Sequence, residues 1–235
     1  MHVTQVKSLR WLFAELLVIV LGISIAFQVE QWRQQHEDKA METRAFREVL
    51  GDLDNIEKAI AEAAGSLDAA TESASDLVQL IAAENTDENK YLESILGIHV
   101  YLIGEAQDRT AYEGLLEAGR FAGVDNPELT VHLRNFFTLQ KPWVYSLNIR
   151  HIERYDNLMN TIYRDLQRVP DADFSTTRKS HIAFAVPLNE FPRSPTMTND
   201  LLGFIASSQT MKERFAFLQQ QLEDVRGEID LYLGK

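Results

Sequence analysis

One apolar run near the start of the chain constrains the fold more than any other feature. The nineteen residues from Trp11 to Val29 contain a single charged side chain, that of Glu15. As an α-helix the run covers roughly 28 Å, about the thickness of a bilayer's hydrocarbon core. Trp11 opens the run and Trp32 follows it, and indole rings favour the membrane interface. We therefore predict an N-terminal arm over residues 1–10 and a transmembrane helix over residues 11–29, with Trp11 and Trp32 as interface anchors.

A cleaved signal peptide is the competing interpretation of this run. The residues Ser24, Ile25 and Ala26 have the small-x-small pattern of a cleavage site. The apolar run is longer than the usual signal-peptide core of about 7–15 residues. It also contains an acidic residue and continues into further helical sequence without a breaker. These features favour an uncleaved anchor.

Small residues and an acid share one face of the predicted span. Gly22 lies seven residues after Glu15, and Ala26 lies four residues after Gly22. Two small residues four apart allow membrane helices to approach closely. The face formed by Glu15, Gly22 and Ala26 indicates self-association or contact with another membrane protein. Two alternatives stay open, namely that Glu15 lies near the headgroups or protonates, and that several copies form an ion path around it.

The charges beside the span give conflicting indications of its orientation. A short basic leader before a single apolar run is typical of an anchor whose carboxyl side lies outside. A count of basic residues alone favours the domain inside, because two precede the span (Lys7, Arg10) and four follow it closely (Arg33, Lys39, Arg44, Arg47). We expect a periplasmic domain, with a cytoplasmic one as the alternative.

Composition excludes several classes of protein. Apolar residues make up 45% of the 235-residue chain and charged residues 25%, which is typical of globular proteins and not of disordered ones. The net charge of −12 argues against sequence-independent nucleic-acid binding, which requires clustered basic residues. The absence of cysteine excludes disulfides, cysteine-ligated metals and thiol catalysis.

Beyond the span, apolar residues recur at helical spacing almost throughout. We predict an all-α protein in which the transmembrane helix continues into an antiparallel helical bundle. Residues 30–168 form its first part, residues 169–197 a long loop and residues 198–235 a C-terminal bundle helix. The loop contains four of the six prolines. Within it, residues 181–186 form either a short strand or a segment laid over the bundle.

Local signals predict where the middle helices begin and end. Residues 30–84 form one helix or a helix pair, with Gly51 and Gly65 as weak points, and residues 88–103 form another helix. A short helix around Leu115 ends at Gly119 or Gly123. Further helical boundaries are an N-cap at Asn126, with proline at the first helical position, and a kink or break after Gln140 caused by Pro142.

An aromatic-rich stripe runs along the segment that follows Asn126, and we interpret it as core. That interpretation is favoured because packing explains such stripes far more often than ligand binding does. The stripe comprises Leu133, Phe136, Phe137, Trp143, Leu147, Tyr155, Leu158, Met159 and Ile162.

Two blocks of sequence resemble a family of single-span bacterial membrane proteins of unknown function. The first is Glu15 followed by an apolar run with glycine, alanine and glutamine, then Trp32 and a charged helix; Gln31 departs from it, since asparagine is more common there. The second joins tyrosine, leucine, glycine, asparagine, leucine and an aromatic pair, here Tyr112, Leu115, Gly119, Asn126, Leu129 and Phe136–Phe137. The resemblance implies one span in the bacterial inner membrane and a helical domain, and it implies no activity.

A search for chemistry in the sequence finds no catalytic or cofactor pattern. No histidine follows a glutamate at the Glu-x-x-His spacing of di-iron bundles, and no phosphate-binding loop or nucleophile elbow occurs. We therefore predict no enzyme activity, no cofactor and no metal. One polar spot, formed by Tyr112, Arg120, Asn126 and Arg134, is a possible recognition site, with capping and turn stabilisation as the favoured alternative.

These features predict a membrane-anchored helical protein that acts through protein–protein contact, as a homo-oligomer or as an accessory subunit. Its expected partners are membrane lipid and either itself or another membrane protein, without nucleic acid. The first alternative is a ligand-sensing bundle with a pocket near Arg120 and the long loop. The second is an oligomeric ion path lined by Glu15.

Overall fold

The computed structural model describes residues 4–100, 109–119, 121, 124, 126–163, 166–168, 182–184 and 195–234. The chain divides into two compact units, residues 1–48 and residues 49–235. The fold is predominantly helical, as predicted, and a long apolar helix stands at its amino end.

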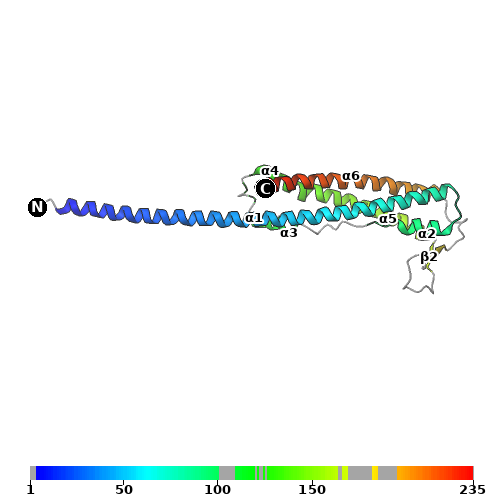
Figure 1. Ribbon diagram of the computed structural model, residues 1–235, viewed down its shortest axis with the longest axis horizontal. Coiled ribbons are helices and arrows are strands. Elements are labelled where there is room, and N and C mark those ends of the chain that lie inside the picture. Colours follow the sequence, from blue (N-terminus) through cyan, green and yellow to red (C-terminus); the bar gives the residue numbers. More distant parts are fainter. Residues whose placement is uncertain are drawn as a thin grey trace. The chain divides into compact units, whose positions relative to one another are not determined.

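The first helix, α1 (Thr4–Ala82), is 79 residues long and enters both units (Figure 1). It is a single helix and not a pair. Gly51 and Gly65 lie within it, and a Cβ atom added at either position would meet only open space. The predicted weak points therefore do not end the helix.

Within the second unit, the buried positions of α1 follow a strict heptad spacing. They alternate in steps of four and three residues from Val49 to Ile81: Val49, Leu53, Ile56, Ile60, Ala63, Leu67, Ala70, Ala74, Leu77 and Ile81. Such an alternation is the pattern of helices that pack side by side with a slight left-handed twist. Helical spacing of apolar residues in the sequence also predicts Leu50 and Ala64 on the buried face, but both are only half-buried, because they fall outside the heptad.

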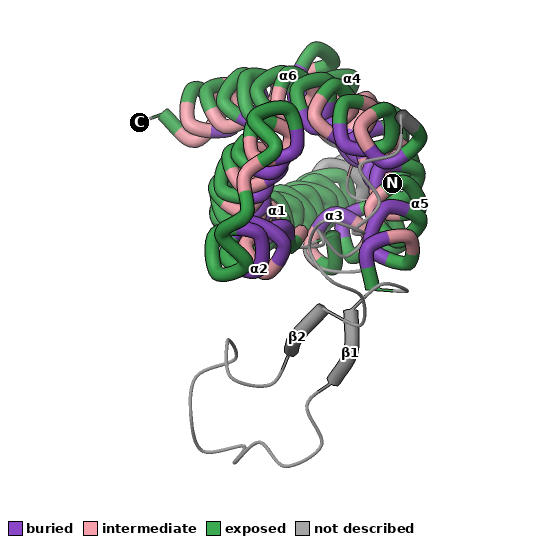
Figure 2. The backbone as a smooth tube through the Cα atoms, turned by 90° about the vertical axis from the view of Figure 1, so that its right-hand side faces the viewer, coloured by how far each residue is buried: buried purple, intermediate pink, exposed green. Residues whose placement is uncertain are grey.

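The last helix, α6 (Pro195–Tyr232), has a seam with the same spacing. Its buried positions are Met197, Leu201, Phe204, Ser208, Met211, Phe215, Leu218, Leu222, Val225 and Ile229. Leu77, Leu158 and Phe204 belong to one core cluster, which joins α1, α5 (Lys141–Tyr163) and α6. These three helices run side by side, and their buried faces point toward one another (Figure 2).

Helix α2 (Glu88–Gly97) packs closely against α1. The side chain of Asp87 caps its first turn by accepting hydrogen bonds from the amides of Asn89 and Lys90. A Cβ atom at Gly97 would lie 2.9 Å from the Cβ atom of Ser73 on α1. The helix ends at Gly97 and not at residue 103; residues 101–103 lie outside the described part of the chain.

The predicted boundaries of the next two helices are confirmed. Helix α3 (Thr110–Glu117) ends before Gly119, which adopts a positive φ of 64°. Helix α4 (Pro127–Asn135) begins with proline, and the side chain of Asn126 accepts a hydrogen bond from the amide of Leu129. Gly119 thus adopts the left-handed backbone conformation that glycine tolerates at the end of a helix.

Pro142 is accommodated by a wider helical turn and does not break the chain. A five-residue π-helical turn, η2 (Phe136–Gln140), joins α4 directly to α5. Proline lacks an amide hydrogen and its ring collides with the carbonyl four residues earlier, and a widened turn relieves that conflict. Of the predicted kink or break after Gln140, the break does not occur, and the irregularity lies just before Pro142, where it was expected.

Two short strands follow α5. Strand β1 (Leu166–Arg168) pairs antiparallel with β2 (Ile182–Phe184), and Gln167 lies opposite Ala183. The first part of the bundle was predicted to extend to residue 168, but its last helix, α5, ends at Tyr163. Of the two possibilities for residues 181–186, the strand is the one observed. The predicted loop over residues 169–197 is too long at its end, because α6 begins at Pro195.

Candidate functional site

The apolar part of α1 is exposed along its whole length. From Trp11 to Val29, the large apolar side chains are 52–67% exposed, and Glu15, Gly22 and Ala26 are exposed too. A Cβ atom at Gly22 would meet nothing within 4 Å. The hydroxyl of Ser24 donates to the carbonyl of Val20 at 2.8 Å, which satisfies this polar group within the helix. The predicted association face is thus uncovered.

Charged and aromatic side chains gather just after this run. Trp32 is exposed, and its ring lies 4.2 Å from that of His36. Arg33 is bound on both sides, to Glu30 at 2.7 Å and to Glu37 at 2.7 Å. The hydrogen bond and charge of Arg33 lower the pKa of Glu30. The helix therefore changes from predominantly apolar to ion-paired within about one turn.

The structure brings together only part of the predicted polar spot. Tyr112 is buried, and its ring stacks on Phe137 with 4.6 Å between ring centres. Burial raises the pKa of Tyr112 against the opposing influence of Arg134 and Arg109, so Arg134 lies near it. Asn126 has the capping role described above, as the structural alternative predicted. Arg120 lies outside the described residues.

The heptad seam of α5 contains polar residues that sequence reasoning missed. Lys141, Asn148 and His151 occupy core positions and are 8%, 2% and 2% exposed. Ser208 occupies a seam position of α6 and is fully buried. Polar residues in such a seam cost stability but can specify how helices align.

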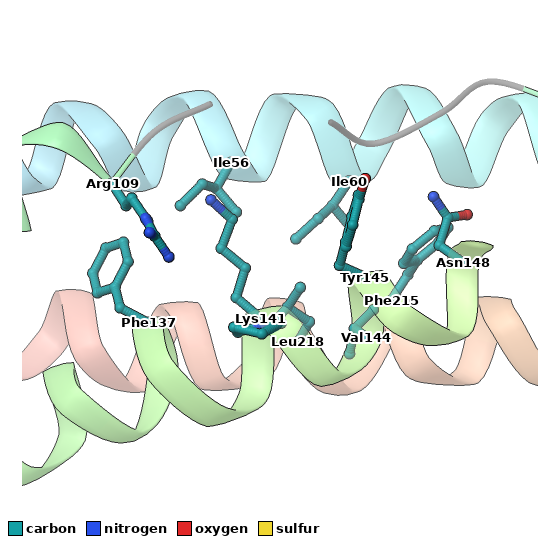
Figure 3. A pocket seen from close by; sticks show the side chains of 11 residues that line it. Ile56, Ile60, Arg109, Phe137, Lys141, Val144, Tyr145, Asn148, Phe215 and Leu218 are labelled. Carbon is teal, nitrogen blue, oxygen red and sulfur yellow. The ribbon is translucent and has the colours of Figure 1, made fainter. Parts of the chain in front are cut away.

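A small cavity adjoins this polar stretch (Figure 3). Its volume is about 30 Å³, which holds about two water molecules. Ile56 and Ile60 of α1 and Phe215 and Leu218 of α6 form apolar walls; the side chains contributed by α5 include Lys141, Tyr145 and Asn148. The cavity is too small for any but the smallest ligands.

His151 is held in one orientation by α6. Its Nδ1 atom lies 2.9 Å from the hydroxyl oxygen of Ser207, and that hydroxyl donates to the carbonyl of Phe204 at 2.9 Å. Because the hydroxyl proton is used, Nδ1 carries a proton and donates it to Ser207. The His151 ring also stacks on Phe204 at 5.2 Å. Burial, and secondly the charge of Arg154, lower the pKa of His151 to about 4, so its ring is neutral at pH 7.

The sequence prediction misplaced the core face of α5. Trp143 and Leu147 were expected inside, but Trp143 is 43% exposed, and the guanidinium of Arg214 lies 4.8 Å from the centre of its ring. Apolar character alone chose those two residues. The heptad spacing through Val144, Asn148, His151 and Tyr155 was the signal that could have identified the true seam.

The described residues contain no cluster of three or more histidine, aspartate or glutamate side chains able to hold a metal. Comparison of the chain with protein-family models, with curated proteins and with solved structures finds no match.

Proposed function

We propose that the chain is a single-span membrane protein whose helical domain acts through protein–protein contact. The observation that supports this most is the exposure of every large apolar side chain from Trp11 to Val29. Soluble monomers rarely expose apolar patches beyond a few hundred Å², whereas a lipid bilayer covers a surface of this kind without cost. Residues 11–29 are therefore the membrane span, with Trp11 and Trp32 at its two interfaces.

The second unit is proposed to be an antiparallel helical bundle in the periplasm, anchored to the bacterial inner membrane. The matching heptad seams of α1, α5 and α6 support the bundle. Ion pairs also join α1 to α6: Lys212 binds Asp68, and Arg226 binds both Asp54 and Glu57. The basic leader that precedes the span supports the outside location.

Association through the span is the proposed mode of action. Gly22 and Ala26 lie four residues apart on α1, both uncovered, so a second helix can approach its backbone closely. Glu15 lies toward the same face, where a polar partner would lower the cost of its burial in lipid. The protein acts as a homo-oligomer or as an accessory subunit of another membrane protein, without catalysis.

Native mass spectrometry of the full chain in a mild detergent tests the association. We expect oligomers for the unchanged protein and a shift to monomer for Gly22→Leu, which fills the close approach. Val20→Phe adds bulk about 200° around the helix and serves as the control, with oligomers retained. Monomer alone for the unchanged protein, together with no co-purifying membrane subunit, contradicts the proposal.

A further inference from the structure

An open groove runs between α5 and α6 on the outer side of His151. Its volume is about 310 Å³, enough for a small polar molecule. Leu147, Arg150, His151 and Arg154 line it from α5, and Ala206, Ser207, Thr210 and Met211 line it from α6. It is distinct from the small cavity beside Lys141, with which it shares no lining residue.

The charge of this groove is positive on a strongly acidic chain. Arg150 and Arg154 lie one helical turn apart on α5, and both are exposed. Within the described residues neither forms an ion pair, and no carboxylate lines the groove. By contrast, Arg33, Arg109 and Arg226 all bind carboxylates. Two guanidinium groups with unused donors thus face one open space.

The wall contributed by α6 adds hydroxyl groups, and a contact between His151 and Ser207 joins the two walls. Ser207 and Thr210 line the groove from α6, and each hydroxyl now donates to a backbone carbonyl of its own helix, those of Phe204 and Ala206. Such hydroxyls can turn to donate to a bound oxygen. The contact of His151 with Ser207 holds the two helices at a fixed separation at this level.

We propose that this groove binds a phosphate group. Guanidinium groups donate paired hydrogen bonds that match the oxygens of a phosphate, and such charge-assisted bonds are about twice as strong as neutral ones. Arg150 and Arg154 bind two oxygens, and Thr210 donates to the third. The phosphate is a monoester, either of a small soluble molecule or of a lipid such as phosphatidate, because only a monoester presents three terminal oxygens to Arg150, Arg154 and Thr210.

Isothermal titration of the full chain in a phosphate-free maltoside detergent, at constant ionic strength and pH 7.5, tests the proposal. The probes are inorganic phosphate, glycerol 3-phosphate and dioctanoyl phosphatidate. The double variant Arg150→Gln with Arg154→Gln removes both guanidinium groups. The control, Arg44→Gln with Arg47→Gln, removes the same charge from two exposed positions of α1 outside the groove.

We expect saturable binding of inorganic phosphate that weakens by about tenfold or more in the groove variant and is unchanged in the control. Tighter binding of phosphatidate than of glycerol 3-phosphate, lost in the same variant, supports the proposal and identifies the lipid as the source. Equal or tighter binding of glycerol 3-phosphate, again lost in that variant, supports it with a soluble source. No saturable binding of any probe, or equal weakening in both variants, overturns it. None of these results depends on whether the span self-associates.

Discussion

Arg226 on α6 reaches across to Asp54 on α1, with 2.7 Å between Nη2 and Oδ1. The same nitrogen lies 2.8 Å from Oε2 of Glu57, and Nη1 binds Glu223 of its own helix at 3.1 Å. The side chain of Arg226 is only 22% exposed, whereas that of Asp54 is 71% exposed. One partly buried cation therefore joins three carboxylates at the junction of two long helices.

Replacing this cation should destabilise the second unit. In Arg226→Gln, Asp54, Glu57 and Glu223 repel one another without a counter-charge, and we expect the free energy of unfolding to fall by about 1–3 kcal/mol. Arg44→Gln is the control, because Arg44 is 82% exposed and, among the residues that the structure describes, pairs with Glu48 of its own helix. Its effect should stay below about 0.5 kcal/mol. Equal effects in urea unfolding would show that the junction contributes nothing beyond a surface pair.

The close approach of α2 to α1 predicts a penalty for a single methyl group. The Cβ atom of Gly97→Ala would lie 2.9 Å from that of Ser73, so one helix must shift, and we expect a loss of about 1–3 kcal/mol. Gly65→Ala has open space and should instead stabilise α1 by about 0.5–1 kcal/mol. Thermal unfolding of the two variants checks the opposite signs, and a stabilised Gly97→Ala would contradict the packing.

The end of α1 contains a strained residue that can be relieved. Glu84 has a positive φ of 50°, and the amides of Glu84 and Asn85 donate to the carbonyls of Ile81 and Leu80. This is the Schellman arrangement, in which glycine is preferred at the left-handed position. Glu84→Gly should therefore raise stability by about 1 kcal/mol, or the melting temperature by about 2–4 °C. A lower melting temperature would show that the Glu84 side chain contributes more than its backbone costs.

His151 should make stability depend on pH in a defined window. The pKa of His151 is about 4 in the folded chain and about 6.5 in the unfolded chain. Between these two pH values the unfolded state binds a proton on His151 and the folded state does not. Stability is therefore lost as the pH falls from about 6.5 to 4, by up to about 3 kcal/mol.

The matched variant isolates this contribution. His151→Gln does not titrate, so the difference in unfolding free energy between the unchanged protein and the variant should shrink between pH 7 and pH 4. Urea unfolding at both pH values measures it. A difference that stays constant would mean that His151 has the same pKa in the folded and unfolded states.

The predictable parts of this fold are those set by local chemistry. The capping of α4 by Asn126 and the left-handed Gly119 follow from short-range backbone preferences; the first was predicted, and Gly119 was one of two predicted ends of α3. The irregularity before Pro142 was located correctly, but its π-helical form was not predicted, because a kink, a break and a widened turn can each relieve the same steric conflict.

The candidate sites depend on which face of each helix is buried. The buried face of α5 could not be predicted from the sequence as readily as the caps. Burial of Asn148 and His151 in place of Trp143 is decided by the register between α5 and α6, a tertiary property that apolar content does not reveal. The groove arginines were missed for the same reason. Arg150 and Arg154 form a candidate site only together with Ser207 and Thr210, which line the groove from the neighbouring helix.

Residues 11–29 are proposed to cross a bilayer, and a chain without cysteine allows a direct test of this. Single variants Gln5→Cys, Ile19→Cys and Gln35→Cys of the full chain are reconstituted in sealed vesicles and treated with a membrane-impermeant maleimide, before and after permeabilisation. We predict that the first and third label from opposite sides and that Ile19→Cys does not label from either. Labelling of Gln5→Cys and Gln35→Cys from the same side, or of Ile19→Cys in intact vesicles, would contradict the membrane span.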